Sequence, residues 1–116
     1  SDPAYQEGKV RKQHEQETLY TQAMQSPYTS ILFGNDLISF HDMQDIFLMG
    51  NLQNQVYPLY DQLKDRRGLN GVKDHLSYVS FHREDYSKEK QNIAKYLQQS
   101  IKQYLQTVKI QDKGME

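Results

Sequence analysis

Apolar side chains recur with helical spacing along most of this chain, but they are sparse at its N-terminal end. Residues 4–25 are charged and Gln-rich, and Ser26-Pro27 follows them. Proline disfavours the helical region for the residue before it, so a helix should end there. The pattern predicts a mostly exposed helix over residues 4–25, whose second half docks on the rest of the molecule.

The middle of the chain alternates apolar runs with turn residues. Residues 26–36 hold a short aromatic and β-branched run that ends in Gly34-Asn35-Asp36, and we expect an ordered loop there. Residues 37–66 hold two apolar stretches, separated by Gly50-Asn51, and the second contains Pro58. Because proline removes a backbone hydrogen bond, the pattern predicts a kinked or broken helix over residues 37–66, restarting near Tyr57 if it breaks.

The C-terminal third lacks helix-breaking residues over a long stretch. A turn is expected at Asp65-Arg66-Arg67-Gly68-Leu69-Asn70-Gly71, and neither Gly nor Pro occurs from residue 72 to 109. Apolar side chains follow a spacing of four and three there, which predicts one long helix or two consecutive helices. A break near residues 80–84 is favoured, because Ser80 followed by acids resembles a helix start. Residues 110–116 are expected to form a tail.

These elements predict an all-α fold, an antiparallel bundle of three or four helices with a long C-terminal helix, in a single domain over residues 1–116. A hydrophobic fraction of 36% and a mean hydropathy of -0.92 indicate a thin, elongated core. No apolar run approaches the length of a membrane span.

The stretch from Ile38 to Met49 is the most apolar part of the chain. On a continuous helix, Phe40, Met43 and Phe47 share one face, which should fill the core, while other apolar side chains fall on other sides. A helix that is apolar nearly all round is either central or faces a second molecule. We therefore expect a partner or dimer surface that includes Leu48, Met49, Tyr57 and Tyr60.

Charge and residue types exclude several kinds of chemistry. There is no cysteine, which removes disulfides and thiolate metal sites. One side of a helix could hold His41, Asp42 and Asp45, and another could hold His75 and His82. Neither set has the number of ligands that a protein metal site usually has. Polar residues at the edge of the core are the simpler interpretation. We predict no metal site, no cofactor and no catalytic residues, because no nucleophile motif or phosphate-binding loop occurs.

A second interpretation is nucleic-acid binding through a basic turn at residues 64–73. Its cations are Lys64, Arg66, Arg67 and Lys73, and acids are interleaved with them. With a net charge of -1 the chain as a whole does not attract phosphates, which argues against nucleic acid.

The residues together favour a non-enzymatic helical protein that acts through contacts with another protein or with itself. The chain starts at Ser1 without a methionine, which is compatible with a removed leader or with a tag remnant. Its cysteine-free, Gln- and Tyr-rich composition favours a bacterial domain that is secreted or anchored at the cell surface, such as a lipoprotein domain, over a cytoplasmic one.

Overall fold

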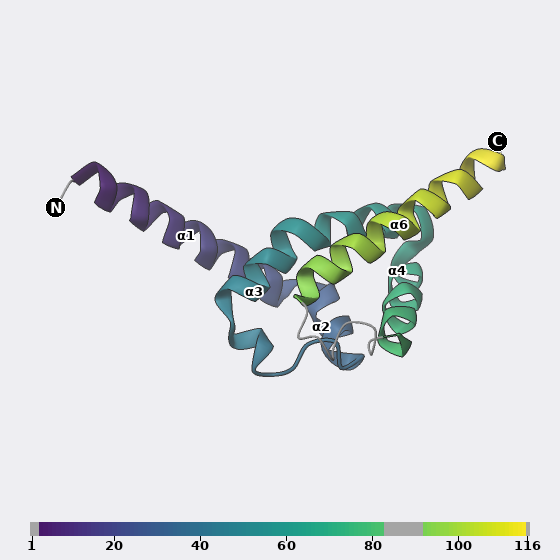
Figure 1. Ribbon diagram of the computed structural model, residues 1–116, viewed down its shortest axis with the longest axis horizontal. Helices are drawn as coiled ribbons and strands as arrows, with labels where there is room; N and C mark the ends of the chain where they lie inside the picture. Colours follow the sequence, from purple (N-terminus) through teal and green to yellow (C-terminus); the bar gives the residue numbers. More distant parts are fainter. Residues whose placement is uncertain (1–2, 83–91, 116) are drawn as a thin grey trace.

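The computed structural model describes residues 3–82 and 92–115, and every regular element in these ranges is helical (Figure 1). The elements in chain order are α1 (Pro3–Gln25), α2 (Pro27–Gly34), the 3₁₀ turn η1 (Asp42–Gln44), α3 (Ile46–Asn51), the π-helical turn η2 (Leu52–Val56), α4 (Tyr57–Phe81) and α6 (Ile93–Gly114). The predicted fold class, a helical bundle with a long C-terminal helix, is confirmed.

Helix α1 confirms the predicted exposed helix and its docked second half. Ala23 is its only buried residue, and its N-terminal half projects away from the body of the molecule (Figure 1). The C-terminal half packs on α3. Gly50 permits this approach, since a Cβ at that position would lie 2.7 Å from Oε1 of Gln16 on α1.

The prediction of a loop over residues 26–36 was wrong, because most of this segment forms helix α2. Ser26 caps this helix by accepting a hydrogen bond from the backbone N–H of Tyr28, and Pro27 occupies the first turn, where its missing N–H costs nothing. Tyr28, Thr29 and Leu32 are buried against the rest of the core.

The predicted helix over residues 37–66 starts later than expected. Ser39 and Asp42 bond each other's backbone N–H groups, and the Asp45 side chain accepts from the N–H groups of Phe47 and Leu48. These bonds hold an irregular segment and 3₁₀ turn before α3, so no continuous helix aligns Phe40 with Phe47. The core placement of these two rings was wrong, since they are 67% and 71% exposed; Met43 is partly buried.

From Ile46 to Phe81 the chain follows a helical path with two irregularities. The first irregularity is the π turn η2. Helix α4 begins directly after it at Tyr57, as the restart alternative predicted, so Pro58 lies in the first turn of α4. The second irregularity is a kink at Gly68, whose φ of 74° and ψ of 179° are not helical. The predicted turn at residues 65–71 is therefore a bend within α4, where the ribbon changes direction (Figure 1).

In the part of the C-terminal third that the structure describes, the chain forms two helices, the second of the predicted alternatives. Helix α4 ends at Phe81, and Asn92 caps α6 by accepting from the backbone N–H groups of Ala94 and Lys95. Residues 83 and 84 of the predicted break lie outside the described residues. The prediction of a tail over residues 110–116 was wrong for residues 110–114, because α6 continues to Gly114. None of the helices in the described ranges is long and apolar enough to cross a membrane.

The core contains the buried tyrosines Tyr28, Tyr57 and Tyr60, and their hydroxyls are hydrogen-bonded. Thr29 donates its hydroxyl hydrogen to the carbonyl of Ala23 at 2.6 Å, while its oxygen lies 2.5 Å from the hydroxyl of Tyr57. The Tyr28 hydroxyl donates to Asp61 at 2.6 Å. Burial raises the pKa of Tyr57 to about 12. A core with few apolar residues is thus completed by aromatic rings with satisfied polar tips.

Candidate functional site

The second half of α4 and helix α6 run antiparallel and leave a cleft between them. His75 of α4 lies beside Ser100 and Tyr104 of α6, while Arg67, earlier in α4, meets Asp112, later in α6. The cleft has a volume of about 390 Å³. Asp74, His75 and Tyr78 line it from α4, and Ser100, Gln103 and Tyr104 line it from α6.

His75 is the most deeply placed of these side chains, and it is held on several sides. Its Nδ1 lies 2.9 Å from the hydroxyl of Tyr60, and its ring stacks on Tyr104 with centroids 5.0 Å apart. Its Nε2 lies 3.5 Å from the Ser100 hydroxyl, at the limit of a hydrogen bond. Burial lowers the pKa of His75 to about 4, so the imidazole is neutral at pH 7.

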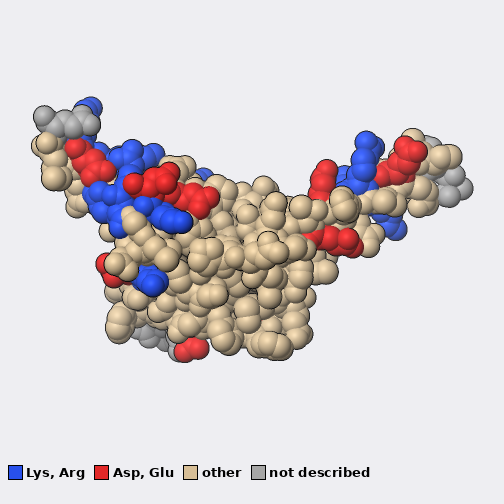
Figure 2. Space-filling model, turned by 180° about the vertical axis from the view of Figure 1, so that it is seen from behind, with Lys and Arg blue, Asp and Glu red and all other residues tan. Residues whose placement is uncertain are grey.

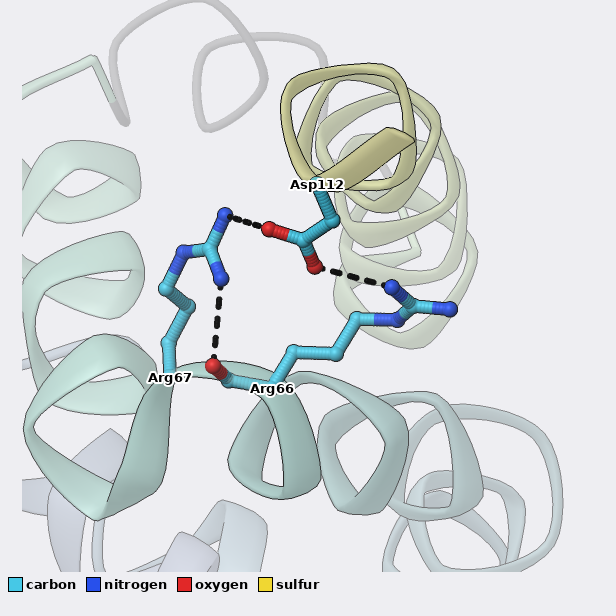
Figure 3. A network of polar contacts seen from close by, with 3 residues as sticks. All are labelled: Arg66, Arg67 and Asp112. Carbon is cyan, nitrogen blue, oxygen red and sulfur yellow. Dashed lines mark hydrogen bonds and ion pairs between the residues drawn. The ribbon is translucent and has the colours of Figure 1, made fainter. Parts of the chain in front are cut away.

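An ion cluster lies at the end of the same helix pair, next to the kink (Figure 3). Asp112 accepts from Nη1 of Arg66 at 2.8 Å and from Nη2 of Arg67 at 2.6 Å. Arg67 also donates through Nη1 to the carbonyl of Arg66 at 3.1 Å. The hydrogen bonds from Arg67 and Arg66 lower the pKa of Asp112.

Two glycines permit this arrangement of the arginines. Gly68 adopts a backbone conformation with positive φ and extended ψ that is open to almost no other residue. A Cβ at position 71 would collide with the Cβ of Arg67. The Arg-Arg-Gly-Leu-Asn-Gly sequence is therefore a bend that turns both guanidinium groups toward α6.

The structure brings together only part of the predicted nucleic-acid set. Arg66 and Arg67 share Asp112, whereas Lys64 and Lys73 are exposed and make no ion pair with any residue in the described ranges. Charged side chains gather toward the two projecting ends of the molecule, and a broad face between them is largely uncharged (Figure 2). The basic turn is thus partly neutralised by an acid from another helix.

The predicted partner surface is mostly core. Met49, Tyr57 and Tyr60 are buried, the two tyrosines with their rings against Tyr28 of α2, and Leu48 is partly buried. Their placement on a surface was wrong for these three residues. Whether Leu48 contacts a partner stays a prediction.

A different apolar surface is exposed between α1 and α3. Ile46 and Phe47 of α3 face Gln13 and Gln16 of α1 across a cleft of about 540 Å³, which we call the α1–α3 cleft. Its rim carries Lys12, Glu15 and Glu17. Phe47, 71% exposed, is a large ring next to a hollow, a combination typical of contact surfaces.

The residues considered for a metal site do not assemble one. Asp42 and Asp45 bond backbone N–H groups, and the His82 ring packs on Tyr78 instead of approaching His75. In the ranges that the structure describes, no three His, Asp or Glu side chains lie close enough to hold an ion.

Sequence reasoning missed the α4–α6 cleft and the role of Asp112. A signal was present, since Asp74, His75 and Tyr78 share one helical face, and polar or aromatic residues recur on α6 at positions 100, 103, 104 and 107. Two such faces do not reveal that they meet, because His75 and Ser100 are 25 residues apart.

Comparison with known proteins identifies a family. No curated protein and no solved structure matches the chain. A protein-family model described as the Lactococcus lactis RepB C-terminus matches residues 1–113, which is nearly the whole chain. The chain therefore belongs to the Lactococcus lactis RepB C-terminus family.

Proposed function

We propose that this chain is a non-enzymatic contact module of a plasmid replication protein, and that it joins two copies of that protein through the α1–α3 cleft. The family's name supports the replication context, since RepB denotes a plasmid replication protein. The proposal places the chain near plasmid DNA, and so departs from the extracytoplasmic location that composition favoured.

The exposed apolar surface of the α1–α3 cleft is the observation that carries the proposal. Phe47 and Ile46 are 71% and 41% exposed and lie beside a hollow large enough to accept a side chain from another molecule. Covering them would remove apolar surface from water, the main driving force of association. Buried aromatic rings commonly dominate the affinity of such interfaces.

The charges around the cleft favour a second copy of the chain as the occupant. In a twofold contact the same surface is used by both molecules, so it must complement itself. Lys12 and the acids Glu15 and Glu17 lie on the same rim, and a twofold rotation can bring the cation of one copy to the acids of the other. A net charge of -1 produces little general repulsion between copies.

The projecting half of α1 fits the role of a spacer between this module and the rest of a replication protein. Helix α1 has polar residues on all sides and buries only Ala23. A helix that is polar all round typically bridges between domains through solvent. The contact module would then be held at a distance from the rest of the protein.

The test is the oligomeric state in solution, measured by light scattering after size exclusion over a range of concentrations. We expect a concentration-dependent dimer, and Phe47→Ser should weaken it about 10-fold or more, as for other buried aromatic contacts. Phe81→Ser is the matched control, because Phe81 is 86% exposed at the end of α4 and should leave the dimer unchanged. A wild-type chain that stays monomeric at high concentration would overturn the proposal.

Contact with DNA is the second candidate, favoured by the family and by Arg66 and Arg67. If these side chains bind phosphates, Asp112 competes with DNA for both of them. Asp112→Asn should then increase affinity for duplex DNA at low salt, and Arg66→Ala with Arg67→Ala should abolish the gain. Fluorescence anisotropy at two salt concentrations measures both effects. Unchanged affinity in Asp112→Asn would remove this candidate.

A further inference from the structure

The α4–α6 cleft has the composition of a site for a small planar ligand. Tyr78 of α4 and Tyr104 of α6 line it together with His75 and Ser100, and the Tyr104 ring stacks on His75. A volume of about 390 Å³ falls in the range of known small-ligand pockets, roughly 300–1,000 Å³. Tyr78 is 60% and Tyr104 37% exposed, so both rings have area left to cover.

The network around His75 fixes a hydrogen-bond donor that faces this cleft. Tyr60 is 1% exposed, and Nδ1 of His75 is the hydrogen-bond partner of its hydroxyl among the described residues. A buried phenol must donate its hydrogen, so Nδ1 accepts. In a neutral imidazole the proton is then on Nε2, whose contact with Ser100, at 3.5 Å, is weak. This N–H group is available to a ligand with a better acceptor.

Hydrogen-bond acceptors line the same cleft as that donor. Asp74 precedes His75 on α4, and Gln103 lines the cleft from α6. Neither side chain makes a hydrogen bond or ion pair with another residue in the ranges 3–82 and 92–115. The lining of the cleft thus includes one fixed N–H donor, a carboxylate acceptor and two aromatic rings.

This arrangement matches the edge of a nucleobase that carries an amino group next to a ring nitrogen. Adenine and cytosine have such an edge, whereas thymine has no amino group. We propose that the α4–α6 cleft binds an adenine or cytosine base between Tyr78 and Tyr104, with the ring nitrogen accepting from His75 Nε2–H and the amino group donating to Asp74. The inference goes beyond self-association and does not depend on it.

The surroundings favour a base within single-stranded DNA over a free nucleotide. Among the residues that the structure describes, no Lys or Arg lines the cleft, so the phosphate of a bound mononucleotide would meet none of their cations there. Arg66 and Arg67 lie farther along the same helix pair, about two turns or ~12 Å from His75. A strand of several nucleotides can place one base in the cleft and a phosphate near the arginines.

The experiment compares fluorescein-labelled 12-nucleotide dA, dC and dT strands, with adenosine and AMP as competitors. We expect dA and dC to bind more tightly than dT, and Tyr78→Ala or Tyr104→Ala to weaken dA binding about 10-fold or more through lost stacking. Asp74→Asn should reduce the preference over dT. Tyr5→Ala is the matched control, since Tyr5 is an exposed tyrosine on α1 and should have no effect.

Several results would overturn the inference. They are the absence of binding by all strands and by adenosine, equal affinity for dA and dT, and binding that is insensitive to Tyr78→Ala and Tyr104→Ala. Adenosine or AMP that binds as tightly as the strand would support the base site but assign it to a free nucleotide. Phe47→Ser should leave strand binding intact, so failure of the dimer and failure of the base site can be told apart.

Discussion

At the residue scale, His75 couples the protonation of the protein to its stability. It is buried with its ring between Tyr60 and Tyr104, and burial lowers its pKa to about 4 from an ordinary 6.5. Between these pH values the unfolded chain binds a proton that the folded chain excludes. The stabilising contribution is complete above about pH 6.5 and is lost as the pH falls toward 4.

We therefore expect the free energy of unfolding to fall by about 2 kcal/mol between pH 7 and pH 5 on account of His75 alone. Urea denaturation at several pH values measures this slope. His75→Gln should reduce the slope over the same interval, even if it lowers stability at pH 7. His14→Gln, at an exposed position of α1, should preserve it. An equal slope in His75→Gln and the wild type would contradict the expectation.

At the element scale, the bend in α4 depends on Gly68. Its φ of 74° with ψ of 179° falls in a region that is essentially restricted to glycine. Gly68→Ala should lower the free energy of unfolding by about 1–3 kcal/mol, as for other strained backbone positions. It should also separate Arg66 and Arg67 from Asp112, because the kink directs them toward α6.

Chemical denaturation measures the loss, and the side-chain NMR signals of the two arginines report whether the ion cluster persists. Gly34→Ala is the matched control, since a Cβ there would meet nothing within 4 Å and its φ is ordinary. If Gly68→Ala were no less stable than Gly34→Ala, the bend would not need glycine.

The elements that sequence could predict are those with long, uninterrupted patterns. The spacing of apolar residues predicts helices α4 and α6, and Ser26-Pro27 predicts the end of α1. Helix α2 was missed, although the same dipeptide also begins it. The start of α3 was misplaced because either Ser39 or Asp45 can cap a helix, and tertiary contacts decide between them. The later start, at Ile46 instead of residue 37, leaves Phe47 on the surface instead of in the core.

The candidate sites were harder to predict, because each combines distant segments. Arg66 and Asp112 are 46 residues apart, and a local pattern reports the basic residues without the acid that pairs with them. The buried tyrosines were hard to predict for the same reason. A tyrosine can be buried when its hydroxyl has a hydrogen-bond partner, as Tyr57 has in Thr29, and otherwise it favours the surface. The partner is visible only in the fold.

At the scale of the whole molecule, the chain is elongated, as its low hydropathy predicted. Its radius of gyration is 16.3 Å and its dimensions are 59 × 35 × 24 Å, whereas a compact domain of this length would have a radius of gyration of about 13 Å. Helices α1 and α6 extend beyond the body at opposite ends (Figure 1). The free half of α1 has no core of its own to stabilise it.

Hydrogen exchange should therefore divide α1 into two halves. Isolated helices shorter than about 12–15 residues are marginal in water, so amides of residues 4–13 should exchange much faster than those of residues 17–25, which pack on α3. Gly8→Ala should slow exchange in the outer half, because alanine favours the helix by about 1 kcal/mol over glycine. Mass spectrometry of peptides from each half, at concentrations below dimerisation, measures the difference.

Helix α6 provides the comparison within the same chain. Its buried residues run from Ala94 to Val108, so that protection should persist over most of its length. Equal protection of both halves of α1 in the monomer would mean that the outer half is stabilised by contacts that its polar surface does not indicate. Protection of the outer half that rises with concentration would instead show that a second molecule covers it.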